Sequence, residues 1–183
     1  MRAKIQFLST SFLLIFLGLL FSAYPRISAA ANVAVPTVVG QTEAAARSAI
    51  TGTCDAGDPS ATPPVAAVCL QVAVTYAFDS TKPAGTVISQ SPAATPNPPG
   101  VPSSTTVNIV VSNHLTVPNV VGQPQQTATL MINNICVPGS STLCLKVGTV
   151  TQATSSTVPK GTVISQDPTA GFQTPAGSAV NIV

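Results

Sequence analysis

Short runs of β-branched and apolar residues, bounded by Pro, Gly and polar residues, recur along the chain after residue 31. Such runs are typical of short strands. The expected strands cover residues 70–76, 86–90, 106–111, 145–151, 162–166 and 179–183. They fall into two successive groups of three, which predicts two small sheets.

A segment with helical spacing precedes each group of strands. Thr42 and Glu43 offer an N-cap and a first-turn acid for a short helix that ends at Ile50. In the second segment, Pro124 suits the first helical turn. The apolar stripes expected to face the sheets are Ala46, Ala49 and Ile50 in the first helix, and Ala128, Met131, Ile132 and Ile135 in the second.

Three sequence blocks return in the same order, which is typical of a tandem repeat. The blocks are Val-Pro-Thr-Val-Val-Gly-Gln at 35–41 and Val-Pro-Asn-Val-Val-Gly-Gln at 117–123, Gly-Thr-Val-Ile-Ser-Gln at 85–90 and 161–166, and Val-Asn-Ile-Val at 107–110 and 180–183. A small module that occurs twice favours a binding function over a single deep active site.

We therefore predict an α+β fold of two modules in tandem, each a three-stranded sheet with one short helix packed on it. The first repeat covers residues 32–112, the second covers residues 117–183, and residues 113–116 link them. The first repeat also carries two Pro-rich insertions, which we expect to be surface loops.

Residues 1–31 have the layout of a secretory signal peptide. Arg2 and Lys4 precede an apolar run at 7–23, and small residues at 28–31 suit a cleavage site. We expect cleavage after residue 30 or 31 and an exported product, periplasmic or secreted, with no membrane span after cleavage. An uncleaved membrane anchor is the alternative, because about 17 apolar residues can just span a bilayer.

The charge of the expected mature chain excludes one class of function. Only 7% of all residues are charged, and residues 32–183 hold four basic and five acidic residues, a formal net charge of −1. A nucleic-acid-binding protein needs clustered Lys and Arg to displace counterions. We therefore expect no nucleic-acid partner.

The four cysteines occupy equivalent places in the two repeats. Cys54 aligns with Cys136, and Cys69 aligns within one residue of Cys144. Four cysteines allow three pairings, and the repeat favours disulfides Cys54–Cys69 and Cys136–Cys144 in an oxidising compartment. A zinc site is the rival interpretation, but no Cys-x-x-Cys occurs and His114 stands alone. We expect no metal and no cofactor.

Catalytic residues are not arranged for any familiar reaction. A Ser nucleophile would need a His base held by a carboxylate, and the one histidine lies outside both repeats. The acidic residues do not occur at aligned positions, which argues against a duplicated glycosidase pair. We predict that the protein is not an enzyme.

The second repeat resembles a PASTA domain, the module named for penicillin-binding proteins and serine/threonine kinases. The matching residues are 117–122, 145–150, 157–168, Gly171 and 177–180. The first repeat matches at 35–40 and 85–92 but departs at 82–84 and after Pro92. The resemblance implies a three-stranded sheet with one helix, and a role at the bacterial cell wall as a binder of peptidoglycan fragments or as a spacer and partner contact.

Two pairs of polar residues are candidate ligand contacts. Gln90 and Gln166 can donate to and accept from amide or sugar groups, although we favour a role as caps of the turns that follow their strands. Lys82 and Lys160 precede Gly85 and Gly161 on exposed turns, where they could meet a peptide-stem carboxylate. The expected partner is peptidoglycan or a muropeptide; the alternative is a structural or interaction module for an envelope protein.

The disulfide assignment gives the first testable prediction. Replacing Cys136 and Cys144 together should lower the free energy of unfolding of the second module by about 2.5 kcal/mol, because the bridge restricts the unfolded chain. The first module should be nearly unaffected, since separate cores couple little. Urea unfolding followed module by module measures this, and peptide mapping without reduction should find no bridge between the repeats. A bridge from Cys54 to Cys136 or Cys144 would contradict the two-module arrangement.

Overall fold

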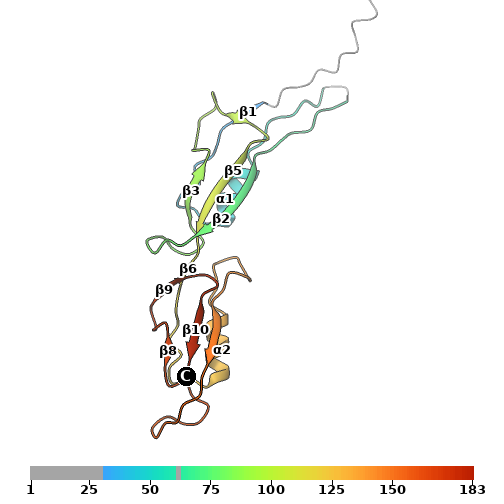
Figure 1. Ribbon diagram of the computed structural model, residues 1–183. Coiled ribbons are helices and arrows are strands. Elements are labelled where there is room, and N and C mark those ends of the chain that lie inside the picture. The colour runs from blue at the N-terminus through green and yellow to red at the C-terminus, as the bar shows by residue number, and fades with distance from the viewer. Residues whose placement is uncertain (1–30, 61–62) are drawn as a thin grey trace, which may run out of the picture.

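The computed structural model describes residues 31–60 and 63–183. The expected signal peptide, apart from residue 31, lies outside the described residues. Two separate hydrophobic cores are present, and Figure 1 shows the two corresponding units following each other along the chain. We call residues 32–112 the first module and residues 114–183 the second module. The predicted α+β fold in two small modules is confirmed.

The first module is a three-stranded sheet with a helix on one face (Figure 1). Its elements are β1 (Asn32–Val33), α1 (Glu43–Thr51), β2 (Gln71–Ala77), β3 (Val87–Ser91), β4 (Val101–Pro102) and β5 (Thr106–Ser112). The central strand β5 pairs parallel with β2 and antiparallel with β3. Strands β1 and β4 form a small antiparallel sheet of their own.

The second module repeats this plan with shorter strands. Its elements are β6 (His114–Thr116), α2 (Gln125–Asn133), β7 (Lys146–Val150), β8 (Gln166–Asp167), β9 (Gln173–Pro175) and β10 (Ala179–Ile182). The central strand β10 pairs parallel with β7 and antiparallel with β8. Strands β6 and β9 form the small antiparallel sheet that corresponds to β1 and β4.

Helix α1 begins and packs as its sequence predicts, whereas α2 differs in two details. Pro124 is the N-cap residue and not part of the first helical turn, and Ile135 lies beyond the end of the helix at Asn133. The side chain of Thr42 accepts a hydrogen bond from the backbone N–H of Ala45 at 3.3 Å, which caps α1. Ala46 and Ile50 of α1 are fully buried in the first core, and Ala128 and Ile132 of α2 are fully buried in the second. A nine-residue helix is marginal alone, so this packing stabilises it.

Three details differ from the expected strands. Strand β8 contains only residues 166 and 167, whereas a strand was expected over 162–166. Strands β4 and β9 have no counterpart among the predicted strands, because two or three residues are too few to show a pattern. The expected linker contains β6, whose Leu115 is buried in the second core.

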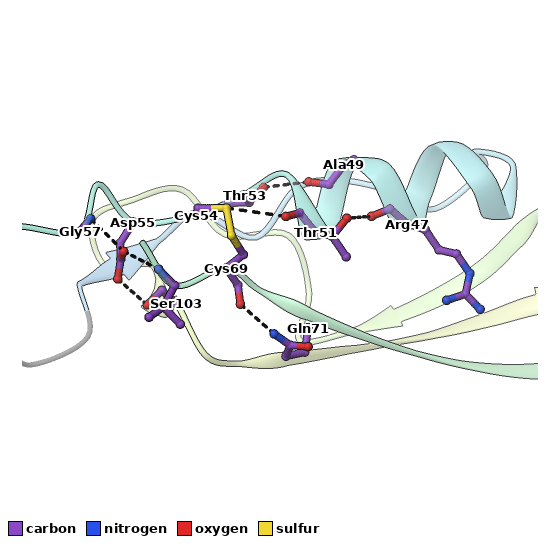
Figure 2. The surroundings of a disulfide bond; sticks show 11 residues. Arg47, Ala49, Thr51, Thr53, Cys54, Asp55, Gly57, Cys69, Gln71 and Ser103 are labelled. Atoms are coloured by element: carbon purple, nitrogen blue, oxygen red, sulfur yellow. Dashed lines mark hydrogen bonds between the residues drawn. A yellow bond between two sulfur atoms is a disulfide. The ribbon is translucent and has the colours of Figure 1, made fainter. Parts of the chain in front are cut away.

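Each module contains one disulfide, Cys54–Cys69 or Cys136–Cys144, the pairing that the repeat alignment favours. In both modules the bridge closes the connection between the helix and the strand that follows it. Figure 2 shows Asp55 beside the first bridge, close to Gly57 and Ser103. Its carboxylate accepts hydrogen bonds from Val68 N at 2.8 Å, Gly57 N at 3.1 Å and the Ser103 hydroxyl at 2.8 Å.

No helix in residues 31–60 or 63–183 is long and apolar enough to cross a membrane.

Acidification should release the long loop of the first module. The hydrogen bonds from Val68 N, then Ser103 and Gly57, hold the pKa of Asp55 below its ordinary value of 3.8. Because the folded-state pKa is the lower one, the ionised carboxylate stabilises the loop above the unfolded-state pKa, and this stabilisation is lost as the pH falls through the folded-state pKa. Amide exchange at Val68 and Gly57 should therefore accelerate as the pH falls below about 4, after correction for intrinsic exchange.

The matched control for this titration is Asp55→Asn, which should show faster exchange at Val68 already at neutral pH and little further response to acid. Protection of Val68 that stays constant from neutral pH down to about pH 2 in the unmodified protein would contradict the role of the carboxylate.

Candidate functional site

The repeated glutamines fasten the opening block of each module to its sheet. In the first module, Gln90 Oε1 accepts a hydrogen bond from Val38 N at 2.8 Å, and its Nε2 donates to Pro36 O at 3.0 Å and Pro92 O at 3.3 Å. The bond to Pro92 is the turn cap that we favoured from the sequence. The bonds to the opening block, more than 50 residues away, were not predicted.

The second module repeats the arrangement atom for atom. Gln166 Oε1 accepts from Val120 N at 2.7 Å, and Nε2 donates to Pro118 O at 2.9 Å and Pro168 O at 3.1 Å. Both polar atoms of each glutamine side chain are therefore engaged within the protein. A ligand that used Gln90 or Gln166 would first have to displace these bonds, so we assign the pair a structural role.

The two candidate lysines are exposed but do not occupy equivalent positions. Aligned on the shared Gly-Thr-Val block, Lys82 corresponds to Val158, and Lys160 corresponds to Ala84. Lys82 lies on a turn held by Asp79, whose Oδ1 accepts hydrogen bonds from Thr81 N and from the Thr81 hydroxyl. These two bonds lower the pKa of Asp79, and Lys82 and His114 lower it further by smaller amounts. The predicted contacts of both lysines with a ligand remain predictions.

Lys160 stands at a cavity of about 540 Å³ in the second module. This volume is within the usual range for small-molecule sites. The lining comes from the connection between β7 and β8, from the end of β10 and from the start of α2; its residues are Gln125, 150–155, 158–164, Ile182 and Val183. Figure 1 shows the connection between β7 and β8 extending past the end of β10, which is marked C.

The lining offers several ligand-binding groups. Thr151, Gln152 and Ser155 supply hydroxyl and amide groups, and Lys160 is the charged residue in the lining. Val163 and Ile182 also belong to the second core, where they are 3% and 2% exposed. The lining thus combines apolar residues, hydroxyl and amide groups, and one lysine.

A polar cluster on the first module was not predicted as such. The Tyr76 hydroxyl donates to Glu43 Oε2 at 3.0 Å, and Arg47 Nε lies 2.8 Å from Glu43 Oε1. Partial burial, and then Glu43, raise the pKa of Tyr76. Glu43 and Arg47 form an i, i+4 ion pair on α1, and Tyr76 of β2 donates its hydrogen bond to the same carboxylate. The cluster therefore ties α1 to β2, and we assign it no ligand.

His114 lies at the start of the second module. Its Nδ1 is 3.2 Å from the Ser112 hydroxyl, and its ring meets the Phe78 ring edge-on with centroids 6.4 Å apart. The histidine is half-buried rather than freely exposed in a linker.

The family of the second module is now clear from the comparisons. Residues 115–183 match the family model of the PASTA domain. The resemblance seen in the sequence blocks is confirmed for this part of the chain, and the cavity lies within it. No curated protein matches the chain.

Two solved structures are similar to the chain. One is the three-PASTA-domain region of a Ser/Thr kinase from Staphylococcus aureus, with 17% identity, a TM-score of 0.35, and coverage of 82% of this chain and 64% of that chain. The other is the entire extracellular region of the Ser/Thr kinase PrkC from Staphylococcus aureus, with 18% identity, a TM-score of 0.32, and coverage of 81% and 45%. The chain thus spans less than two thirds of either.

Removal of the glutamine side chain should destabilise the module that contains it. In Gln166→Ala the N–H of Val120 loses its acceptor while Val120 itself is fully buried. An unsatisfied buried group of this kind costs about 1–3 kcal/mol. Gln90→Ala should destabilise the first module by a similar amount, for the same reason.

Urea unfolding with a separate spectroscopic probe in each module measures both variants, and each should leave the other module unchanged. Gln166→Glu, which keeps an acceptor for Val120 N but loses both donors, should lie between Ala and the unmodified protein. Equal stability of all these variants would show that the glutamine bonds contribute nothing.

Proposed function

We propose that this protein is a non-enzymatic, exported module of the bacterial cell envelope that binds peptidoglycan through its peptide stems. The observation that carries the proposal is the match of residues 115–183 to the PASTA domain, a non-catalytic module. Members of that family are typically extracellular and associated with stem peptides. Two disulfides, which persist in oxidising compartments, support export.

The second module supplies the proposed contact. The lining of its cavity combines the apolar residues Val163 and Ile182 with Lys160. A stem peptide combines short aliphatic side chains with carboxylates. The ammonium of Lys160 meets a carboxylate at the cavity, while the hydroxyl and amide groups of the lining bond to peptide groups. Lys82, on the corresponding turn of the first module, remains a second proposed contact.

Retention on purified sacculi tests this proposal. The mature protein should be retained, and Lys160→Ala should reduce retention by about two- to fivefold, the value of one solvent-accessible charge contact. Higher salt should weaken retention in the same way.

Lys146→Ala is the matched control, because Lys146 is also an exposed lysine of the second module and lies at the end of β7 away from the cavity. Its retention should equal that of the unmodified protein. Recovery of the unmodified protein no greater than that of a protein without wall affinity would overturn the proposal, and equal losses in both lysine variants would remove Lys160 from the contact.

A second candidate function is a structural or interaction module for an envelope protein. The observation that favours it is the internal bonding of Gln90 and Gln166, the polar side chains that recur in both modules. Crosslinking in intact cells separates the two functions, because one dominant protein adduct without sacculus retention would favour this alternative.

A further inference from the structure

A second, smaller hollow lies in the second module, between the opening block and the turn that follows β8. Its volume is about 250 Å³, and it is separate from the cavity at Lys160 except that Ile164 lines both. We call it the β8 hollow. Its lining consists of Asn119 and Val121 from the opening block, residues 164–166, Thr169 and Ala170. None of these described lining residues is charged.

The glutamine bonds hold the two walls of the β8 hollow in place. The side chain of Gln166 bonds to two residues of the opening block and to Pro168 in the turn, so it joins the two segments that form the walls. In the first module Gln90 makes the same three bonds to its own opening block and turn. The corresponding segments of the two modules are therefore held in the same way.

The exposed residues of the β8 hollow recur in the first module. Three of them have the same identity at the aligned position and are exposed there too: Val121 as Val39, Ser165 as Ser89, and Ala170 as Ala94. The two valines are 45% and 47% exposed, and neither belongs to a hydrophobic core. Packing inside the module therefore does not explain why both modules carry valine here.

Exposed positions on the helices differ between the modules. On their outer faces, Ala44, Ala45 and Ser48 of α1 correspond to Gln126, Thr127 and Leu130 of α2, and all six are exposed. Substitutions at such surface positions cost little stability. The valine, serine and alanine that both modules retain therefore indicate a surface with the same task in each.

The chemistry of the β8 hollow suits an uncharged ligand that carries a small apolar group beside polar groups. Val121, Ile164 and Ala170 supply apolar surface. Among the described residues, the hydroxyls of Ser165 and Thr169 have no hydrogen-bond partner, so both can donate to and accept from a ligand. The volume is below the usual range for a whole small-molecule ligand, so it suits one unit of a polymer.

The duplicated surface is uncharged, whereas the charged contact proposed above is not duplicated. Lys160 corresponds to Ala84, so a lysine at that position occurs in one module only. A surface that occurs twice on one chain suits a polymer with a recurring unit, because the second contact then forms at a high effective concentration. The unit that both modules recognise is therefore uncharged.

We propose that the β8 hollow and its counterpart in the first module bind N-acetylated sugar rings of a glycan strand. The acetamido methyl group packs against Val121 and Ile164, and the hydroxyl groups of the ring bond to the polar side chains of the lining. The choice of polymer rests on the proposed wall binding. The inference goes beyond it, since the glycan contact is a different site from the stem contact at Lys160.

The uncharged trisaccharide N,N′,N″-triacetylchitotriose, which carries acetamido groups but no peptide stem, is the direct probe. Added to the ¹⁵N-labelled mature protein, it should shift the amide signals of Val121, Ser165 and Ala170 in a saturable manner. The aligned residues of the first module should respond in the same way. Cellotriose has the same ring linkage but no acetamido group. It should bind at least about fivefold more weakly, because it loses the methyl contact.

A substitution at the exposed valine tests the apolar wall. Val121→Ser should weaken trisaccharide binding to the second module by about three- to fivefold, because apolar contact area is lost. Leu130→Ser is the matched control, since Leu130 is an apolar residue of the same module that is 57% exposed and lies outside the hollow. The inference is wrong if triacetylchitotriose shifts none of these signals, if cellotriose binds equally well, or if the two variants bind equally.

Retention on sacculi separates this inference from the proposed function. If triacetylchitotriose does not bind while Lys160→Ala reduces retention, the glycan site is overturned and stem binding stands. If triacetylchitotriose binds at both hollows while Lys160→Ala leaves retention unchanged, the glycan site stands and the stem contact is overturned.

Discussion

Pairing of the central strand on both of its sides is the constraint on which the rest of each module depends. In the first module β5 contributes Val107, Ile109 and Val111 to one face, where all three are fully buried. The strand runs parallel to β2 and antiparallel to β3, so its pairs join segments that are distant in the sequence. Because β5 and β10 are the last strands of their modules, each sheet and its core are completed only when the end of the module is in place. The central strand therefore holds the core of each module together.

The opening block of each module is held to the sheet by a side chain and not by long strand pairing. Val38 and Val120 are fully buried, so their backbone N–H groups need acceptors where water does not reach. Gln90 and Gln166 supply these acceptors and use their amide hydrogens to bind the preceding proline carbonyl. A glutamine suits this task because one side chain carries both an acceptor and two donors. This explains physically why the same glutamine follows the same Val-Ile-Ser run in both modules.

The sequence predicted the features that depend on local pattern. The helices followed from the cap at Thr42 and from apolar spacing, and five of the six main strands followed from β-branched runs, β8 being the exception. It did not predict the partners of the glutamines, because a side chain that bonds to the backbone about 50 residues away is determined by tertiary structure alone. The cavity was missed for a related reason. Its lining combines Gln125 with residues 150–155, 158–164 and 182–183, which only the tertiary structure brings together. The sequence analysis treated Lys82 and Lys160 as equivalent positions of the two repeats, whereas the alignment on the Gly-Thr-Val block places Lys160 opposite Ala84.

That one difference shows how two modules of the same fold can present different surfaces. In the first module, Ala84 packs against the second core, and a Cβ atom at Gly85 would lie 3.4 Å from Pro138, so this end of the module is part of the junction. In the second module the equivalent position is Lys160, beside the cavity. Burying a lysine against a further apolar surface would cost the solvation of its charge, so this end resists the close packing that Ala84 permits.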